Sequence, residues 1–201
     1  VVATGAALDM LHVEVGAQTR LFLGGAEVDV VLVDRVTALP GDVEDAEYAA
    51  VIELDLAAVS PHVSGPDTVA VMQPVAELSA ERVAIHKAYL LSCTNARLED
   101  LEEAAGVLRG HRVADGVELY LAAASAETQR DAESSGAWKD LIDAGARPLP
   151  PGCGACIGCG RGVSTAPDQV TVSAINRNFT GRSGPGKLYL ASPLTVAASA
   201  V

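Results

Sequence analysis

Apolar and polar positions follow strand patterns and helix patterns in turn from residue 84 to the end of the chain. Mainly apolar runs at 85–91, 117–123 and 170–175 predict strands buried on both faces of a sheet. A shorter run at 188–190 predicts a fourth strand. The segment after the first run has apolar residues at helical spacing, at Leu98, Leu101, Ala105 and Leu108.

Capping residues mark where the helices are expected to begin. Thr94 or Asn95 would cap the helix after the first strand, and Ser125 would cap the helix after the second. Gly136 is expected to break that second helix, with a further short helix beyond it. Pro193 suits the first turn of a terminal helix.

Before residue 84 the pattern is weaker. The runs at 28–33 and 51–56 predict strands, and 40–42 reads as a turn. The prolines and glycine within 60–67 predict a loop. Residues 148–162, with three prolines and five glycines, cannot form regular structure.

Strands that alternate with helices indicate an α/β protein with a mainly parallel sheet and helices on its faces, in three α/β/α layers. The scarcity of aromatic residues, 3% of the chain, fits a core of small aliphatic side chains. The 201 residues suffice for one sizeable domain with an appendage.

The net charge of −12 argues against nucleic acid and anionic membranes as general partners. No apolar run is long enough to span a membrane, and we see no signal peptide. The chain has four cysteines, three of them within seven residues. In a chain with no sign of secretion, such clustering indicates metal binding or redox chemistry rather than disulfides.

The cysteines form the first candidate site. Cys93 follows a predicted strand, at the sheet edge where α/β proteins bind ligands and where a helix N-terminus favours a thiolate. Cys153 and Cys156 form a C-x-x-C motif among glycines, which allow the backbone to wrap a cluster. From spacing alone, a zinc half-site, a dithiol pair or chance remain alternatives.

The second candidate site is the loop at 176–182, which follows a predicted strand. It carries Asn176, Arg177 and Arg182. Guanidinium groups recognise carboxylates through two hydrogen bonds, so a substrate with two or three carboxylates would suit them. A basic surface loop that offsets an acidic protein is the alternative.

Three motifs together resemble the aconitase superfamily in order and interval. They are the segments at 92–95 (SCTN), 152–158 (GCGACIG) and 176–182 (NRNFTGR). The closing segment at 191–200 resembles the end of the family's third domain. The resemblance covers about residues 46–201, whereas residues 1–45 match nothing in the family and form a separate segment of uncertain assignment. Within the family, 53–56, 64–66 and 113–117 look most like homoaconitase of lysine biosynthesis, with isopropylmalate isomerase of leucine biosynthesis as the competitor.

The resemblance implies a hydro-lyase with a [4Fe–4S] cluster held by Cys93, Cys153 and Cys156. It implies that Asn176, Arg177 and Arg182 contact a small polycarboxylate substrate. Dehydration and rehydration of a hydroxy acid would be the reaction, in the cytoplasm or the mitochondrial matrix.

The chain also departs from the family. The other domains, or a small swivelling subunit, are absent from it, so the isolated chain is expected to be inactive. Cys159 stands where a hydrophobic residue is usual, as a spare thiol, a fourth ligand or a packed core residue. Two alternatives therefore stay open: an isopropylmalate dehydratase large-subunit fragment, and a non-catalytic metal-binding or interaction module.

Overall fold

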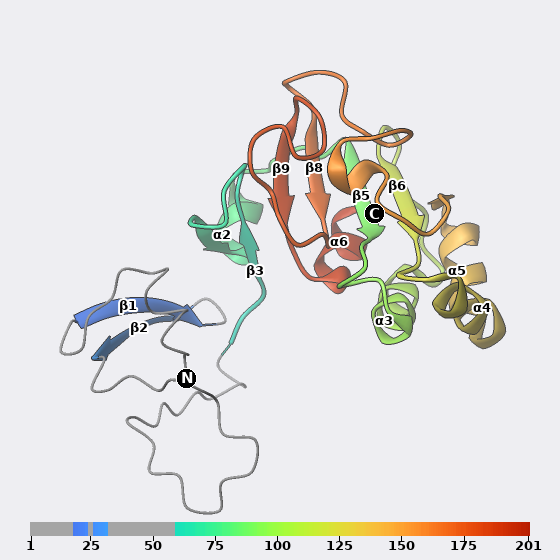
Figure 1. The fold of residues 1–201 in the computed structure, drawn as a ribbon, viewed down its shortest axis with the longest axis horizontal. Helices are drawn as coiled ribbons and strands as arrows, with labels where there is room; N and C mark the ends of the chain where they lie inside the picture. The colour runs from blue at the N-terminus through green and yellow to red at the C-terminus, as the bar shows by residue number, and fades with distance from the viewer. Residues whose placement is uncertain (1–17, 24–25, 32–58) are drawn as a thin grey trace, which may run out of the picture. The chain divides into compact units, whose positions relative to one another are not determined.

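The computed structural model describes residues 18–23, 26–31 and 59–201 (Figure 1). The chain divides into two compact units, Val1–Ser60 and Pro61–Val201.

In the first unit, β1 (Gln18–Leu23) pairs antiparallel with β2 (Ala26–Val31). β2 overlaps the strand predicted at 28–33. The turn predicted at 40–42 and the strand predicted at 51–56 lie outside the described residues. The predicted division at residue 45 stays a prediction.

The second unit is built on a seven-stranded sheet. In spatial order its strands are β4 (Met72–Pro74), β3 (His62–Ser64), β9 (Lys187–Leu190), β8 (Val170–Ser173), β5 (Lys87–Leu91), β6 (Glu118–Ala122) and β7 (Arg147–Pro148). The five strands from β9 to β7 run parallel, whereas β3 is antiparallel to both of its neighbours. The predicted α/β class with a mainly parallel sheet is confirmed.

Strand β3 corrects one expectation, because it lies inside the segment predicted as a loop at 60–67. Its three residues fit between Pro61 and Pro66, and they pair with β4 along their whole length. Only Ser64 pairs with β9. A strand of only three residues leaves no alternating pattern that a sequence could reveal.

The helices that cover the sheet are α2 (Val75–Ala80), α3 (Leu98–Leu108), α4 (Ala126–Ser135), α5 (Ala137–Ala144) and α6 (Pro193–Ser199). α3 packs against α5 and α6, and α6 lies against β5 and β8 (Figure 1). Alternate residues of the central strands, such as Leu90 and Leu121, face these helices in one buried core.

The opposite face of the sheet carries a second core. Tyr89 and Tyr120 point to this side, and the 3-10 turn η2 (Ala155–Ile157) packs on them. In the view of Figure 1 this turn lies over β5. In the described part of the chain, a glycine-rich segment with one helical turn therefore forms the third layer.

At the helix ends, two of the predictions are confirmed and one is wrong. Ser125 accepts a hydrogen bond from the Thr128 N–H at 3.1 Å, and Pro193 occupies the first turn of α6, both as predicted. The cap predicted at Thr94 or Asn95 is wrong, because α3 begins at Leu98. No helix among the described residues is long and apolar enough to cross a membrane.

The amino ends of β5 and β6 are joined by an ion pair. Lys87 and Glu118 stand opposite each other in the parallel register, and the ammonium donates to the carboxylate. Arg147 on β7 donates to the other oxygen of the same carboxylate. The hydrogen bond from Lys87 holds the pKa of the Glu118 carboxyl below its usual range.

This lowered pKa gives a pH prediction. A carboxyl that is more acidic when folded stabilises the protein above the unfolded pKa of about 4.3, and that contribution disappears as the pH falls through the folded value. Glu118→Gln should lower the free energy of unfolding at neutral pH by about 1–3 kcal/mol. Below about pH 5 its loss of stability should be shallower than that of the parent chain.

Urea unfolding at several pH values measures both effects. Glu127→Gln is the control, because Glu127 is exposed on α4. Parallel pH profiles for the parent chain and Glu118→Gln would contradict the prediction.

Candidate functional site

The segment that carries Cys153 and Cys156 is held to the sheet by tyrosines. The Tyr89 hydroxyl donates to the Gly162 carbonyl at 2.6 Å, and burial raises its pKa. A Cβ at Gly162 would lie 3.3 Å from both the Tyr120 ring and Ala155, and its φ is +100°, so glycine favours this close approach of the segment. Cys156 is buried in this contact.

The same segment curls tightly around η2. The Ile157 and Cys159 N–H groups both donate to the Gly154 carbonyl at 3.1 Å. This turn buries Cys156 and leaves Cys153 and Cys159 exposed. The alternative that Cys159 is a packed core residue is therefore wrong. The Cys159 thiol lies 3.9 Å from the Ile157 carbonyl oxygen. All four thiols are free of disulfides.

Cys93 lies in the loop between β5 and α3, with its side chain exposed. Ser92 organises this loop, because its hydroxyl bonds the Thr94 hydroxyl at 2.6 Å and accepts from the Thr94 N–H at 3.0 Å. Asn95 donates to the Ala174 carbonyl at 2.8 Å and ties the loop to the end of β8. The residues predicted to cap α3 thus hold the Cys93 loop instead.

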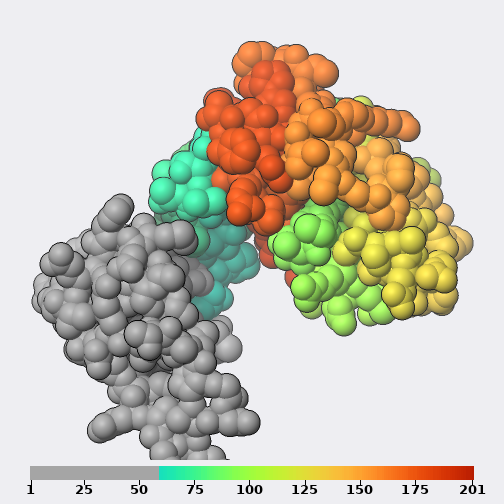
Figure 2. Space-filling model, in the orientation of Figure 1, coloured from blue at the N-terminus to red at the C-terminus, as the bar shows by residue number. Residues whose placement is uncertain are grey.

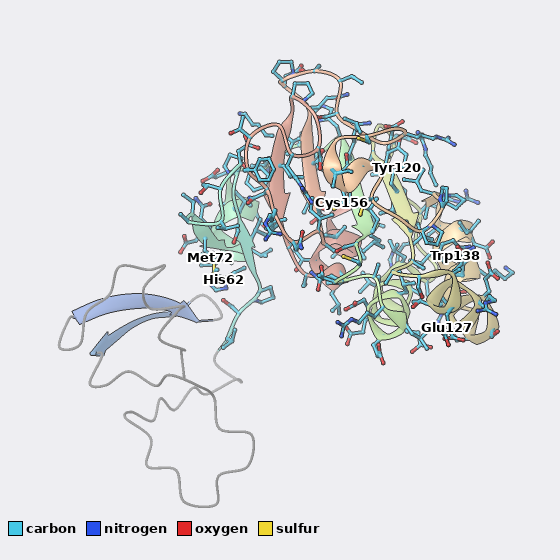
Figure 3. The ribbon with its side chains drawn as sticks, viewed as in Figure 1. His62, Met72, Tyr120, Glu127, Trp138 and Cys156 are labelled. Atoms are coloured by element: carbon cyan, nitrogen blue, oxygen red, sulfur yellow. The ribbon has the colours of Figure 1, made fainter. Side chains whose placement is uncertain are left out.

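The arginine loop, residues 176–182, follows β8 and reaches the cysteine segment. Arg182 Nη2 lies 3.5 Å from Cys156 Sγ. A Cβ at Gly158 would lie 3.2 Å from the Arg182 carbonyl oxygen, so the two backbones also meet. Figure 2 shows the orange and red parts of the chain adjoining on this face, and Figure 3 labels Cys156 among them.

Arg182 is half-buried and packs against an aromatic ring. Its guanidinium carbon lies 5.6 Å from the centre of the Phe179 ring, which is itself 53% exposed. Its Nε is buried and has no acceptor among the described residues. Arg182 therefore keeps donor capacity beside a cysteine sulfur.

The neighbouring residues of the loop divide into exposed and buried. Asn176 and Arg177 are exposed, as residues that meet a ligand would be. Asn178, between them and Arg182, is 1% exposed. Its amide nitrogen lies 3.1–3.3 Å from the carbonyls of Ser64, Thr68 and Leu188.

A serine fixes the far end of the loop. The buried Ser164 hydroxyl donates to the Ser183 carbonyl at 3.0 Å and accepts from the Gly186 N–H at 2.9 Å. A Cβ at Gly184 would lie 2.3 Å from the Ser164 carbonyl oxygen, so only glycine fits there. The cysteine segment and the arginine loop are therefore one packed unit.

The structure thus brings some of the predicted site residues into contact and not others. Arg182 and Cys156 are in direct contact, and the Cys93 loop is tied to the strand that leads into the arginine loop. In the part of the chain that the structure describes, no three His, Cys, Asp or Glu side chains lie close enough to hold one metal ion. The assignment of Cys93, Cys153 and Cys156 as cluster ligands stays a prediction.

Sequence reasoning missed Asn95, Asn178 and Ser164 as the residues that hold the loops. Asn178 lay inside a recognised motif, which could have signalled a role. Its partners Ser64 and Thr68 are more than 100 positions earlier, and no pattern connects them.

Comparison with known proteins relates this chain to one family. Residues 76–201 match the Aconitase family (aconitate hydratase). The chain is 56% identical to "Homoaconitase, mitochondrial" of Candida parapsilosis over 160 residues, 79% of this chain and 23% of that protein. It is 55% identical to the Yarrowia lipolytica protein of the same name over 159 residues, 78% of this chain and 23% of that protein. For the Cryptococcus neoformans protein the identity is 51% over 188 residues, 92% of this chain and 25% of that protein. The chain spans about a quarter of the length of the curated relatives that it matches.

Asn178 and Asn176 provide a matched test of the loop's support. Asn178→Ala removes the donor shared by three carbonyls and should lower the free energy of unfolding by about 1–3 kcal/mol. Asn176→Ala changes an exposed side chain two residues away and should stay within about 0.5 kcal/mol of the parent chain. Urea unfolding measures both, and equal effects would show that Asn178 does not support the loop.

Proposed function

This chain belongs to the aconitase family, and we propose that it supplies the cluster-binding and carboxylate-binding part of a hydro-lyase. The reaction proposed for the full protein is the dehydration and rehydration of a hydroxy polycarboxylic acid of the homoaconitate type. The observation that carries the proposal is the contact between Arg182 Nη2 and Cys156 Sγ, 3.5 Å apart. It puts a carboxylate-binding side chain beside a thiol that is suited to bind a cluster.

The thiols present fit an iron–sulfur cluster. Cys93, Cys153 and Cys156 are free, and two of them are exposed while the third has an arginine donor at its sulfur. Hydrogen bonds to cysteine sulfurs are a usual feature of cluster sites. When bound, such a [4Fe–4S] group would supply a Lewis-acidic iron with a position open to a hydroxyl and a carboxylate.

The arginines would hold the substrate. Arg177 is exposed and can meet a carboxylate directly through its planar fork. Arg182 is half-buried, so water competes less for its hydrogen bonds than for those of an exposed arginine. Asn176 adds an exposed amide next to Arg177. Together these residues would orient the acid through one of its carboxylates.

The remaining catalytic groups would come from outside this chain. A base that removes the proton, and the domains or small subunit that close over the acid, are expected from the remainder of the protein, of which this chain spans about a quarter in its relatives. The isolated chain is therefore expected to bind a cluster without turning over substrate. The mitochondrial matrix is the proposed location, because the three relatives are named as mitochondrial.

Cluster binding is tested on the chain itself. Anaerobic incubation with iron and sulfide should give the broad visible absorption of an iron–sulfur cluster. Cys93→Ser, Cys153→Ser and Cys156→Ser should each abolish it, and Cys159→Ser is the matched control that should keep it. An equal loss in Cys159→Ser would overturn the three-ligand assignment. One zinc and no sulfide would favour the non-catalytic module.

Substrate binding is tested in the full-length protein. Arg182→Gln should lower kcat/KM for homoaconitate at least about tenfold, since a hydrogen bond to a charged group contributes about 1.5–3 kcal/mol. The cluster absorption reports whether the site survives the change. Arg130→Gln is the control, because Arg130 is exposed on α4. Turnover of isopropylmalate in place of homoaconitate would support the competing dehydratase.

A further inference from the structure

A polar cavity lies at the amino ends of β5 and β6, whereas the cysteine loops follow the carboxyl ends of the strands. Its volume is about 340 Å³. Its polar lining consists of His86, Lys87, Glu118, Arg147 and Gln169. None of these residues belongs to the site proposed for the cluster and the acid.

The cations in this cavity outnumber the carboxylates. The Lys87 side chain is only 7% exposed, and Arg147 is 44% exposed. Both donate to the one carboxylate of Glu118, which therefore balances one positive charge of the two. Asp115 and Asp168 are neighbours of the lining in sequence but do not line the cavity. The lining is locally positive in a chain whose net charge is −12.

An aromatic ring fixes the two cations in place. Lys87 Nζ lies 5.4 Å and Arg147 Cζ lies 6.0 Å from the centre of the Tyr120 ring. The Tyr120 hydroxyl in turn donates to Glu118 at 3.1 Å. The cationic groups are therefore already ordered, and a ligand would lose less free energy in ordering them.

The neutral side chains also present donors. His86 Nδ1 accepts from the Val170 N–H at 3.1 Å, so the neutral ring carries its proton on Nε2. The side-chain amide oxygen of Gln169 accepts from the Thr165 N–H at 2.7 Å, which leaves the side-chain NH2 group to donate. The lining therefore adds these two donors to Lys87 and Arg147, which share the single carboxylate of Glu118.

We propose that this cavity binds a small oxyanion, either phosphate or the carboxylate of a small acid. An oxyanion offers acceptors only, and it would take the hydrogen bonds that Arg147, Lys87, His86 and Gln169 have to give. It would also balance the remaining positive charge. The site is separate from the cluster and acid site, and it does not depend on the function proposed above.

The test is titration of the full 201-residue chain, labelled with ¹⁵N, with inorganic phosphate and, separately, with malonate at constant ionic strength. The amide signals of Gly116, Val117 and Gln169 should shift and saturate. Arg147→Gln should weaken the binding by about tenfold, which corresponds to about 1.4 kcal/mol. Arg147→Lys keeps the charge and should weaken it less.

Two controls separate this site from general attraction of anions. Arg109→Gln removes an exposed arginine that also pairs with a carboxylate, that of Asp140. Arg177→Gln removes the exposed arginine of the other site. Both should leave the affinity measured at Gly116 and Gln169 within about twofold. Signals that shift without saturating, or equal weakening in Arg109→Gln, would overturn the proposal, and the parent titration decides even if Arg147→Gln fails to fold. Saturation by only one of the two anions identifies which kind of oxyanion the cavity takes.

Discussion

The site depends on the close approach of a glycine-rich segment to the tyrosine face of the sheet. A parallel sheet must be covered on both faces, because buried strands cannot leave apolar side chains in water. Helices cover one face here, and on the other face a chain with little regular structure has to pack against Tyr89 and Tyr120. It does so because Gly162 allows ring contact and because the Tyr89 hydroxyl satisfies a backbone carbonyl of the segment.

This packing explains why the cysteine loop and the arginine loop act as one unit. Once the segment lies on the sheet, the Ser164 hydroxyl bonds Ser183 and Gly186, which lie on either side of Gly184. Gly184 admits the Ser164 carbonyl where a side chain would collide. Arg182 is then held beside Cys156 by backbone contacts on both sides, without needing a carboxylate partner of its own. In the function proposed above, its charge would stay available for a ligand.

The sequence predicted the parts of this structure that depend on local pattern. The central strands β5, β6 and β8 were predictable because their apolar residues are contiguous, and the caps at Ser125 and Pro193 because their chemistry is local. The motif residues Cys156 and Arg182 were recognisable by family resemblance. Errors arose where a distant partner decides the role. Asn95 has the chemistry of a helix cap, yet its amide bonds a carbonyl that is 79 positions away.

Dependence on distant partners also explains why the cavity at the amino ends of β5 and β6 leaves no pattern in the sequence. Lys87, Glu118 and Arg147 come from three strands that become neighbours only through parallel pairing. In sequence, Lys87 and Glu118 interrupt otherwise apolar runs and look like ordinary strand ends. In the fold they meet over one tyrosine ring, and the burial of Lys87 requires a carboxylate nearby. That requirement explains Lys87 and Glu118 completely. It does not explain a second cation on the same carboxylate, and this excess of charge is what distinguishes a structural ion pair from a cavity with hydrogen-bond donors left for a ligand.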